Sequence, residues 1–132
     1  MIFTNSDGGA RGNPGPGAIG VIVRDDDKIL IKYAGRIGDN VTNNIAEYEA
    51  LIKALELASK LGKEVTCFLD SELVVNQLLG KYKVKNPALL QLFLKVQKMQ
   101  DKFDKINYAY VSRWNKYQLV VDEILNEEFD KG

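Results

Sequence analysis

The sequence predicts an α/β protein whose mixed five-stranded sheet carries helices on its faces. Three observations support this fold class. Residues 1–37 contain three strand-like segments, and a run of aspartates typical of a hairpin turn joins the second to the third. Residues 65–69 form a short apolar run, as expected of a buried strand. Elsewhere, apolar residues recur with helical spacing, which indicates crossover helices.

The N-terminal part is expected to be the antiparallel half of the sheet. Strands are predicted over residues 1–6, 18–24 and 28–37, and the glycine-rich run Asp7–Gly17 is expected to be a loop between the first two. Asp25-Asp26-Asp27 could hold a metal ion, but a tight turn between two strands is the favoured interpretation.

Helices and strands alternate after residue 41. A helix is expected from Thr42-Asn43-Asn44 to about Leu61, closed by Gly62. Its buried stripe follows the 3.6-residue period and consists of Ala50, Leu51, Ala54, Leu55 and Ala58. After the strand at 65–69, Ser71 is expected to cap a short helix to about Leu79.

The last third completes the pattern. Asn86-Pro87 is a typical start for a long helix, because Asn caps helices and Pro suits the first helical position. The inward residues of this region are predicted to be Leu89, Phe93, Val96 and Phe103. A fifth strand is expected over residues 106–112 and a final helix over about 119–129.

Composition limits the size and the chemistry. The chain has 132 residues, 18 basic and 18 acidic, with no His and one Cys, Cys67. This length predicts a single domain spanning residues 1–132, which can bury about 68–70% of its unfolded surface. The absence of His excludes Ser-His-Asp and Cys-His catalysis, and too few soft ligands remain for structural zinc. Without a signal-like segment or a membrane-length apolar run, a soluble cytoplasmic protein is expected.

Three carboxylates stand where solubility does not require them. Asp7 ends the first predicted strand, Asp70 directly follows the buried strand, and Glu47 shares the buried face of its helix. Each has an ordinary alternative, since Asp is common in turns and caps and an early Glu favours the helix dipole. The three converge, however, because the first and fourth strands are expected to be neighbours. Clustered like charges need a counter-cation, and two Mg²⁺ ions would provide it.

The glycine-rich run is not a nucleotide P-loop. It lacks the Gly-Lys-Ser/Thr ending and leads into a strand rather than a helix. A loop with so little side-chain bulk, carrying Asn13, could instead let a nucleic-acid backbone approach closely.

Three motifs resemble the signatures of the type 1 ribonuclease H family. They are Asp7-Gly-Gly-Ala-Arg-Gly-Asn-Pro-Gly-Pro-Gly17, Thr42-Asn-Asn-Ile-Ala-Glu-Tyr48 and Leu69-Asp-Ser-Glu-Leu-Val74, in the family's order and over nearly the whole chain. The resemblance implies a ribonuclease H-like fold with strand order 3-2-1-4-5, in which the first three strands are antiparallel. It also implies hydrolysis of the RNA strand of an RNA–DNA hybrid, leaving 3′-hydroxyl and 5′-phosphate ends.

The resemblance assigns catalytic and metal-binding roles to four carboxylates: Asp7, Glu47, Asp70 and Asp122. Asp7 would bridge two Mg²⁺ ions, with Mn²⁺ as their substitute. Asp122, expected at the start of the final helix, would hold the ion that carries the attacking water. Glu47 and Asp70 would serve the second ion, at the leaving 3′ oxygen. This is the two-metal arrangement that stabilises both the entering and the departing oxygen.

Substrate contacts are implied in the same way. The backbone amides of Gly8 and Gly9 and the side chains of Asn13, Asn43, Asn44 and Glu47 would read 2′-hydroxyls, which distinguish RNA from DNA. Thr42 and Asn86 would hold a phosphate of the DNA strand. For Asn43 and Asn86, helix capping is an equally good interpretation without the resemblance, and both roles can coexist.

Three features depart from the family's pattern. The loop before the last helix has no His, so Arg113 and Lys116 are the nearby cations. Gln118 replaces an Asn four residues before Asp122, Val121 replaces an Ala, and the spacing from Arg113 to Asp122 is about two residues longer. The basic handle is replaced by the short Lys-rich stretch 80–85, which either contacts phosphates or forms a solvated edge.

The sequence therefore supports two hypotheses. The leading one is a Mg²⁺-dependent endonuclease specific for RNA–DNA hybrids. The alternative is a catalytically weak hybrid-binding module with the same fold, which rests on the altered segment from Arg113 to Val121. Under either hypothesis the partner is a hybrid duplex, with no membrane and no obligate protein partner, and the chain is expected to be a monomer.

Overall fold

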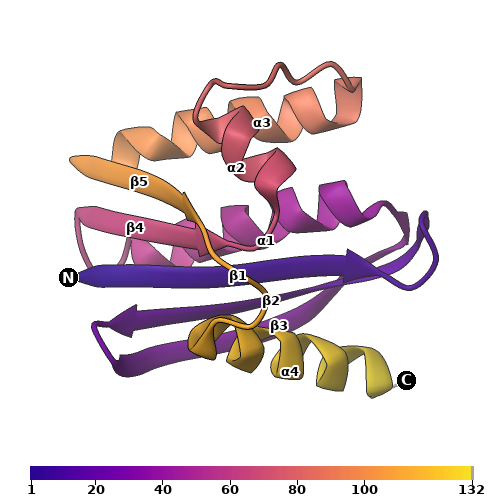
Figure 1. Cartoon of the computed structure of the whole chain (residues 1–132), viewed down its shortest axis with the longest axis horizontal. Coiled ribbons are helices and arrows are strands. Elements are labelled where there is room, and N and C mark those ends of the chain that lie inside the picture. Colours follow the sequence, from indigo (N-terminus) through magenta and orange to yellow (C-terminus); the bar gives the residue numbers. More distant parts are fainter. Residues whose placement is uncertain (132) are drawn as a thin grey trace.

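The computed structural model describes residues 1–131 and contains one mixed five-stranded sheet with helices on both faces (Figure 1). The strand order is β3-β2-β1-β4-β5. β1, β2 and β3 pair antiparallel, whereas β4 and β5 run parallel to β1. The predicted fold class and strand order are confirmed.

The elements alternate as expected from residue 42 onward. The strands are β1 (Ile2–Ala10), β2 (Gly15–Asp25), β3 (Lys28–Val41), β4 (Glu64–Leu69) and β5 (Lys105–Tyr110). The helices are α1 (Asn43–Ala58), α2 (Glu72–Leu78), α3 (Pro87–Met99), a single 3₁₀ turn (Gln100–Lys102) and α4 (Lys116–Asp130). No helix within residues 1–131 is both long and apolar enough to cross a membrane.

The two faces of the sheet are covered by different helices. α1 packs on β1 and β2, and α3 packs on α1, whereas α4, yellow in Figure 1, lies against β1, β2 and β3 on the opposite face. Alternate residues of β2 therefore serve two layers: Val21 and Val23 belong to the α1 core, and Ala18 packs with Leu125 and Phe129 of α4. The predicted stripe of α1 is fully buried.

The N-terminal hairpin is longer than predicted. The sequence predicts that the first strand ends before Asp7 and that Gly8 to Gly17 form a loop, but β1 continues to Ala10 and β2 begins at Gly15. The reason is close packing, because a Cβ atom at Gly8 would lie 2.1 Å from the Ala46 carbonyl oxygen of α1. Gly8, Gly9, Gly15 and Gly17 therefore belong to strands, and only residues 11–14 form the turn.

Helix and strand ends differ from the prediction where local hydrogen bonds decide them. α1 ends at Ala58 rather than near Leu61, since the N–H groups of Lys60 and Leu61 donate to carbonyls three residues back in a tightened turn. α4 begins three residues before Leu119, because the Asn115 side chain accepts hydrogen bonds from two N–H groups of the first turn. β5 ends at Tyr110, where its pairing with β4 stops.

The core residues predicted for the α3 region are mostly confirmed. Leu89, Val96 and Phe103 are buried, and Phe93 is half-buried against the same core. Phe103 lies beyond α3, after the 3₁₀ turn. In β4, the two faces are covered unequally, because Val65, Cys67 and Leu69 are buried whereas Thr66 and Phe68 are only half-buried.

A Gly20→Ala substitution tests how closely α4 must approach the sheet. A Cβ atom at Gly20 would lie 2.9 Å from the Val121 carbonyl oxygen, which is backbone and cannot swing aside. We expect the free energy of unfolding to fall by about 1–3 kcal/mol, measured by urea denaturation. In Gly62→Ala, the nearest atom is the flexible Cγ1 of Ile2 at 3.2 Å, so that control should change stability little. Equal stability of both variants would show that α4 can shift without cost.

Candidate active site

Three carboxylates from three elements meet at one point. Oxygen atoms of Asp7, Glu47 and Asp70 all lie within 4.8 Å of one another. β1 and β4 are parallel and paired at Ser6 and Leu69, so the next residue in each strand direction is an aspartate at the same level of the sheet. The prediction that Asp7 ends β1 is wrong, because Asp7 lies inside the strand and is paired with Gly20 of β2. The convergence of the three residues is as expected.

Glu47 is the most buried member of this cluster. It projects from the inner face of α1 with 8% of its surface exposed, and its Oε1 accepts a hydrogen bond from the Gly8 N–H at 3.3 Å. Its Oε2 is also buried and has no hydrogen-bond partner among residues 1–131. A buried carboxylate oxygen without a donor is costly unless a cation or a proton satisfies it.

Crowding changes the acidity of all three groups. Burial, then the hydrogen bond and the charge of Asp7, raise the pKa of Glu47 well above its ordinary value. Burial raises the pKa of Asp70 to about 6, and the charge of Asp7 adds to the effect. The pKa of Asp7 is raised chiefly by burial, against the lowering effect of its hydrogen bond with Glu47. The ionised cluster is therefore a site of concentrated negative charge made only of oxygen donors, which suits a hard divalent cation.

Asp122 faces the same site from α4. It lines a cleft of about 540 Å³ together with the three clustered carboxylates, and its charge helps to raise the pKa of Asp7. The tight cluster itself contains only the other three residues. The prediction placed Asp122 at the start of the last helix, which is wrong, since α4 begins at Lys116 and Asp122 lies in its second turn. The inward orientation was predicted correctly.

Gln118 explains one departure from the family's pattern. Its side chain is fully buried, donates to the Ser6 carbonyl at 2.8 Å and accepts from the Asn5 amide at 3.2 Å. Because Ser6 precedes Asp7 and Gln118 lies one turn before Asp122, this contact ties the two carboxylate-bearing elements together. An Asn side chain has one methylene fewer to reach across.

Sequence reasoning missed two further residues of this network. Asn5 accepts a hydrogen bond from Nε of Arg24 at 3.1 Å, and the Arg24 side chain is buried at 8% exposure. The Arg24 guanidinium lies over the rings of Phe3 and Tyr117, 4.7 and 3.9 Å from their centroids. An Arg at the end of an apolar strand indicates a surface residue, and no local signal in the sequence marks it as buried.

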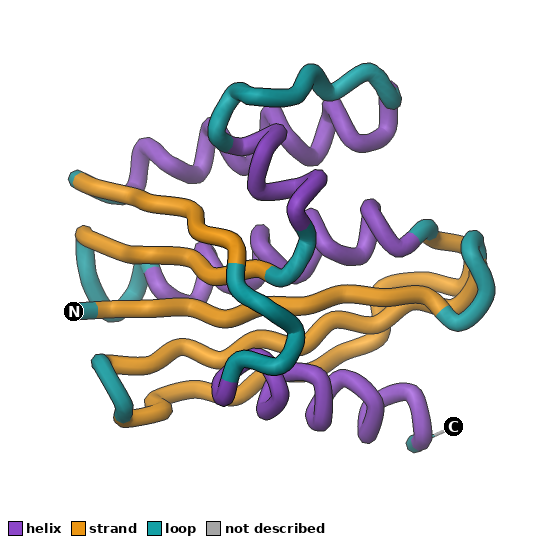
Figure 2. Tube along the Cα trace, in the orientation of Figure 1, coloured by secondary structure: helices purple, strands orange, loops and turns teal. Residues whose placement is uncertain are grey.

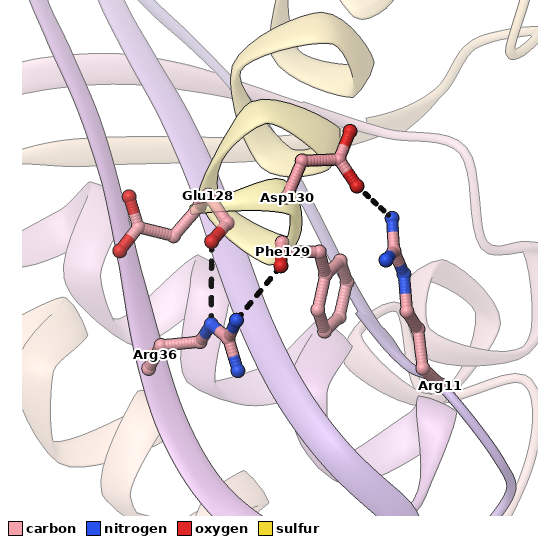
Figure 3. Close-up of polar contacts among 5 residues, drawn as sticks. All are labelled: Arg11, Arg36, Glu128, Phe129 and Asp130. Carbon is pink, nitrogen blue, oxygen red and sulfur yellow. Dashed lines mark hydrogen bonds and ion pairs between the residues drawn. The ribbon is translucent and has the colours of Figure 1, made fainter. Parts of the chain in front are cut away.

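The far end of α4 is held by two arginines (Figure 3). Arg36 of β3 donates to the carbonyls of Glu128 and Phe129 at 3.3 and 2.8 Å, and Arg11 pairs with Asp130 at 2.9 Å. Both guanidinium groups lie over the Phe129 ring. These contacts cap the carbonyl end of the helix, where cations are favourable. α4 is thus attached at both ends, with Asp122 between them.

The predicted substrate-binding asparagines lie at the start of α1. The Asn13 side-chain oxygen accepts from the Asn43 N–H at 3.0 Å, and the Asn43 oxygen accepts from the Ala10 N–H at 2.9 Å. These bonds fix the β1–β2 turn against α1, and Asn44 follows in the first turn, half-buried. Gly9 lies beside Asn43, because a Cβ atom built on Gly9 would lie 4.0 Å from the side-chain oxygen of Asn43.

Helix capping, the alternative interpretation of Asn43 and Asn86, is wrong for Asn43 and confirmed for Asn86. Thr42, not Asn43, caps α1, and its hydroxyl accepts from the Ile45 N–H. Capping by Asn43 is therefore wrong, because Asn43 is already the first helical residue. Asn86 does cap α3, accepting from the N–H groups of Ala88 and Leu89. Neither Thr42 nor Asn86 lines the cleft around the carboxylates.

Comparison with known proteins finds a family match and a longer relative. A family model described as reverse transcriptase-like matches residues 5–117. The bifunctional protein Rv2228c of Mycobacterium tuberculosis is 41% identical over 133 residues, which cover 98% of this chain but 35% of that protein. The chain therefore spans about a third of the length of this curated relative.

Two solved structures share nearly the whole fold. LC11-RNase H1, crystallised in complex with an RNA/DNA hybrid, matches with a TM-score of 0.91 and 38% identity over 99% of this chain and 98% of that one. RNase H1 from the halophilic archaeon Halobacterium salinarum matches with a TM-score of 0.92 and 32% identity over the same shares.

The raised pKa values predict how stability depends on pH without metal. In the folded state Asp70 keeps its proton up to about pH 6, whereas its ordinary pKa is 3.8. The folded state thus binds more protons in this window, so the free energy of unfolding should fall as the pH rises from about 4 to about 6. Asp7 and Glu47, whose pKa values are also raised, add to the fall.

This pH dependence can be measured by urea denaturation in EDTA across that window. Asp70→Asn should make the decline shallower, because the variant has no proton to lose at this position. Asp39→Asn, an exposed change in β3, should retain the wild-type slope. A wild-type stability that rises across the window would contradict the raised pKa values of these carboxylates.

Proposed function

The chain belongs to the type 1 ribonuclease H family, and we propose on this premise that it is an endonuclease hydrolysing the RNA strand of RNA–DNA hybrids. The products would carry 3′-hydroxyl and 5′-phosphate ends. The observation that carries the proposal is the meeting of Asp7, Glu47 and Asp70 in an open cleft, with Asp122 on its wall.

The donor set fits divalent metal ions, for which we propose Mg²⁺. All four side chains offer carboxylate oxygens, and the unpartnered Oε2 of Glu47 is the kind of atom that a cation would satisfy. We propose that Asp7, Glu47, Asp70 and Asp122 hold two ions, with Mn²⁺ as a possible substitute. When bound, such ions lower the pKa of a water molecule and stabilise the leaving oxygen.

The chain's own contribution is to hold the carboxylates ready. The Gly8 N–H orients Glu47, and the Gln118 amide fixes the strand that carries Asp7 against the helix that carries Asp122. Such prior organisation means that little rearrangement is needed when the phosphodiester arrives. Arg113 is the one basic residue among the cleft-lining side chains, and it can attract the phosphate.

We propose that hybrid recognition lies at the start of α1. Because the side-chain oxygens of Asn13 and Asn43 already accept backbone hydrogen bonds, their NH₂ groups remain as donors toward ribose 2′-hydroxyls. Asn44 and the backbone of Gly8 and Gly9 would complete this reading of the RNA strand. Asn86 has its oxygen engaged in the α3 cap, so its NH₂ group, with the Thr42 region, would contact a phosphate of the DNA strand.

A cleavage assay tests the proposal directly. Labelled RNA–DNA hybrid, duplex DNA, duplex RNA and single strands are incubated with the chain in Mg²⁺ or in EDTA and resolved on a gel. We expect cleavage of the RNA strand of the hybrid only, and only with Mg²⁺. Hybrid binding without cleavage would instead identify the chain as a binding module.

Asp7→Asn is expected to abolish hydrolysis while the fold stays intact. The change removes a negative ligand at almost constant volume, and it relieves repulsion in the cluster, so thermal stability in EDTA should not fall. Hydrolysis is measured in the gel assay and folding by circular dichroism. Cleavage near the wild-type rate would remove Asp7 from the active site.

Asp122→Asn tests the fourth carboxylate. If Asp122 helps to hold the attacking water's metal ion, turnover should fall by two orders of magnitude or more, by analogy with the loss of one catalytic charge contact (about 10²–10³ in kcat). Hybrid binding should change little. Glu123→Gln is the matched control, since Glu123 is the next residue on α4 and is exposed. Full activity of Asp122→Asn, or loss of activity in Glu123→Gln, would overturn the assignment.

A further inference from the structure

The cleft has an aromatic rim that the carboxylate chemistry does not explain. Tyr110 and Trp114 line it with 48% and 70% of their surfaces exposed, and Trp114 is the most exposed of the large hydrophobic side chains in residues 1–131. The Arg113 guanidinium lies 5.1 Å from the centre of the Trp114 ring. An indole left this open to water forgoes a large hydrophobic gain unless a ligand covers it.

The loop that carries Trp114 is fixed at both of its ends. Figure 2 shows it crossing from the end of β5 to the start of α4. The Val111 N–H donates to the carbonyl of Leu69, next to Asp70, at 2.9 Å. The Trp114 N–H donates to Oγ of Ser112 at 3.1 Å, and Asn115 caps α4. The backbone of Trp114 is therefore held at the cleft by the same strand end that presents Asp70.

The chemistry of this rim fits the backbone of a nucleic acid. The guanidinium of Arg113 suits a phosphate, and the neighbouring indole suits the apolar side of a sugar. The faces of paired bases are covered by their neighbours inside a duplex, so an indole beside the cleft can reach the sugars and not the base faces. The two aromatic side chains and Arg113 all come from the segment that runs from the end of β5 to the start of α4, so they form one side of the cleft.

We propose that Trp114 is a substrate-binding residue that packs on the sugar–phosphate backbone of the hybrid strand lying in the cleft. The proposal rests on the proposed function and adds a second contact for the same hybrid substrate, on the side of the cleft that carries Trp114. The asparagines of the α1 start hold the duplex by hydrogen bonds, and Trp114 holds it by apolar contact beside Asp70. Tyr110 extends the same surface along the end of β5.

The chain carries its own probe for this contact, because Trp114 is its single tryptophan. In EDTA, where no hydrolysis is expected, a short blunt RNA–DNA hybrid is titrated into the protein. Trp114 emission and its quenching by acrylamide are recorded, and a fluorescent label on the hybrid reports binding independently by anisotropy. We expect the indole to become protected from acrylamide in parallel with the anisotropy change.

Steady-state kinetics in Mg²⁺ supply the second measurement. Trp114→Ala should raise KM about tenfold, which is about 1.4 kcal/mol of binding, with kcat within about twofold of the wild type. Trp114→Phe, which keeps an aromatic face, should restore most of the loss. Leu94→Ala is the matched control, since Leu94 is 53% exposed on α3 and does not line the cleft.

The outcomes separate this proposal from the proposed function. Hybrid binding by anisotropy without protection of Trp114, or an unchanged KM in Trp114→Ala, would overturn the role of Trp114 and leave the nuclease assignment intact. A wild-type chain that neither binds nor cleaves the hybrid would overturn the proposed function and this proposal with it. Since the wild-type fluorescence titration needs no variant, the test does not depend on the folding of Trp114→Ala.

Discussion

The Glu47 carboxylate lies against those of Asp7 and Asp70, and one of its two oxygens is buried without a donor among residues 1–131. Burial raises the pKa values of all three groups, and the charge of Asp7 raises those of Glu47 and Asp70 further. The arrangement survives because rigid elements impose it. Two parallel strands bring the aspartates to one level, and the first turns of α1 bring Glu47 over them.

Close approach of α1 to β1 is the next condition. Gly8 allows it, because a side chain at that position would meet the Ala46 carbonyl, and its N–H then becomes the donor that orients Glu47. Asn13 and Asn43 attach the β1–β2 turn to the same helix start. One helix thus supplies a metal-binding carboxylate on its inner side and the proposed ribose contacts at its beginning, and both depend on the missing side chain of one glycine.

α4 closes the site from the opposite face of the sheet and is attached along its length. Near the start of α4, Gln118 donates a hydrogen bond to β1. Gly20 lets the middle of the helix approach β2, and Arg36 caps the end of the helix. Although the spacing from Arg113 to Asp122 is longer than in the family's pattern, Asp122 lines the cleft with the other three carboxylates. The loop before α4 is short and hydrogen-bonded, and it presents Trp114 at the cleft.

Most of the architecture could be predicted from local patterns, because apolar periodicity and capping act within a few residues. The order of strands and helices, the caps at Ser71 and Asn86, and the convergence of Asp7, Glu47 and Asp70 all follow from such patterns. The errors at helix ends had local causes, such as the Asn115 cap with which α4 begins, whereas the other errors came from contacts between residues distant in the chain.

Gly8 continues a strand, although a glycine-rich run indicates a loop, because the carbonyl of Ala46 is close to it in space. Asn5 and Gln118, 113 residues apart, become partners only once α4 packs on the sheet, and with them Arg24 becomes buried. Asp122 is oriented by the packing of a helix whose start was predicted three residues too late. Side-chain chemistry within one segment predicts which residues can act, whereas their distances depend on packing between segments, which no local pattern encodes.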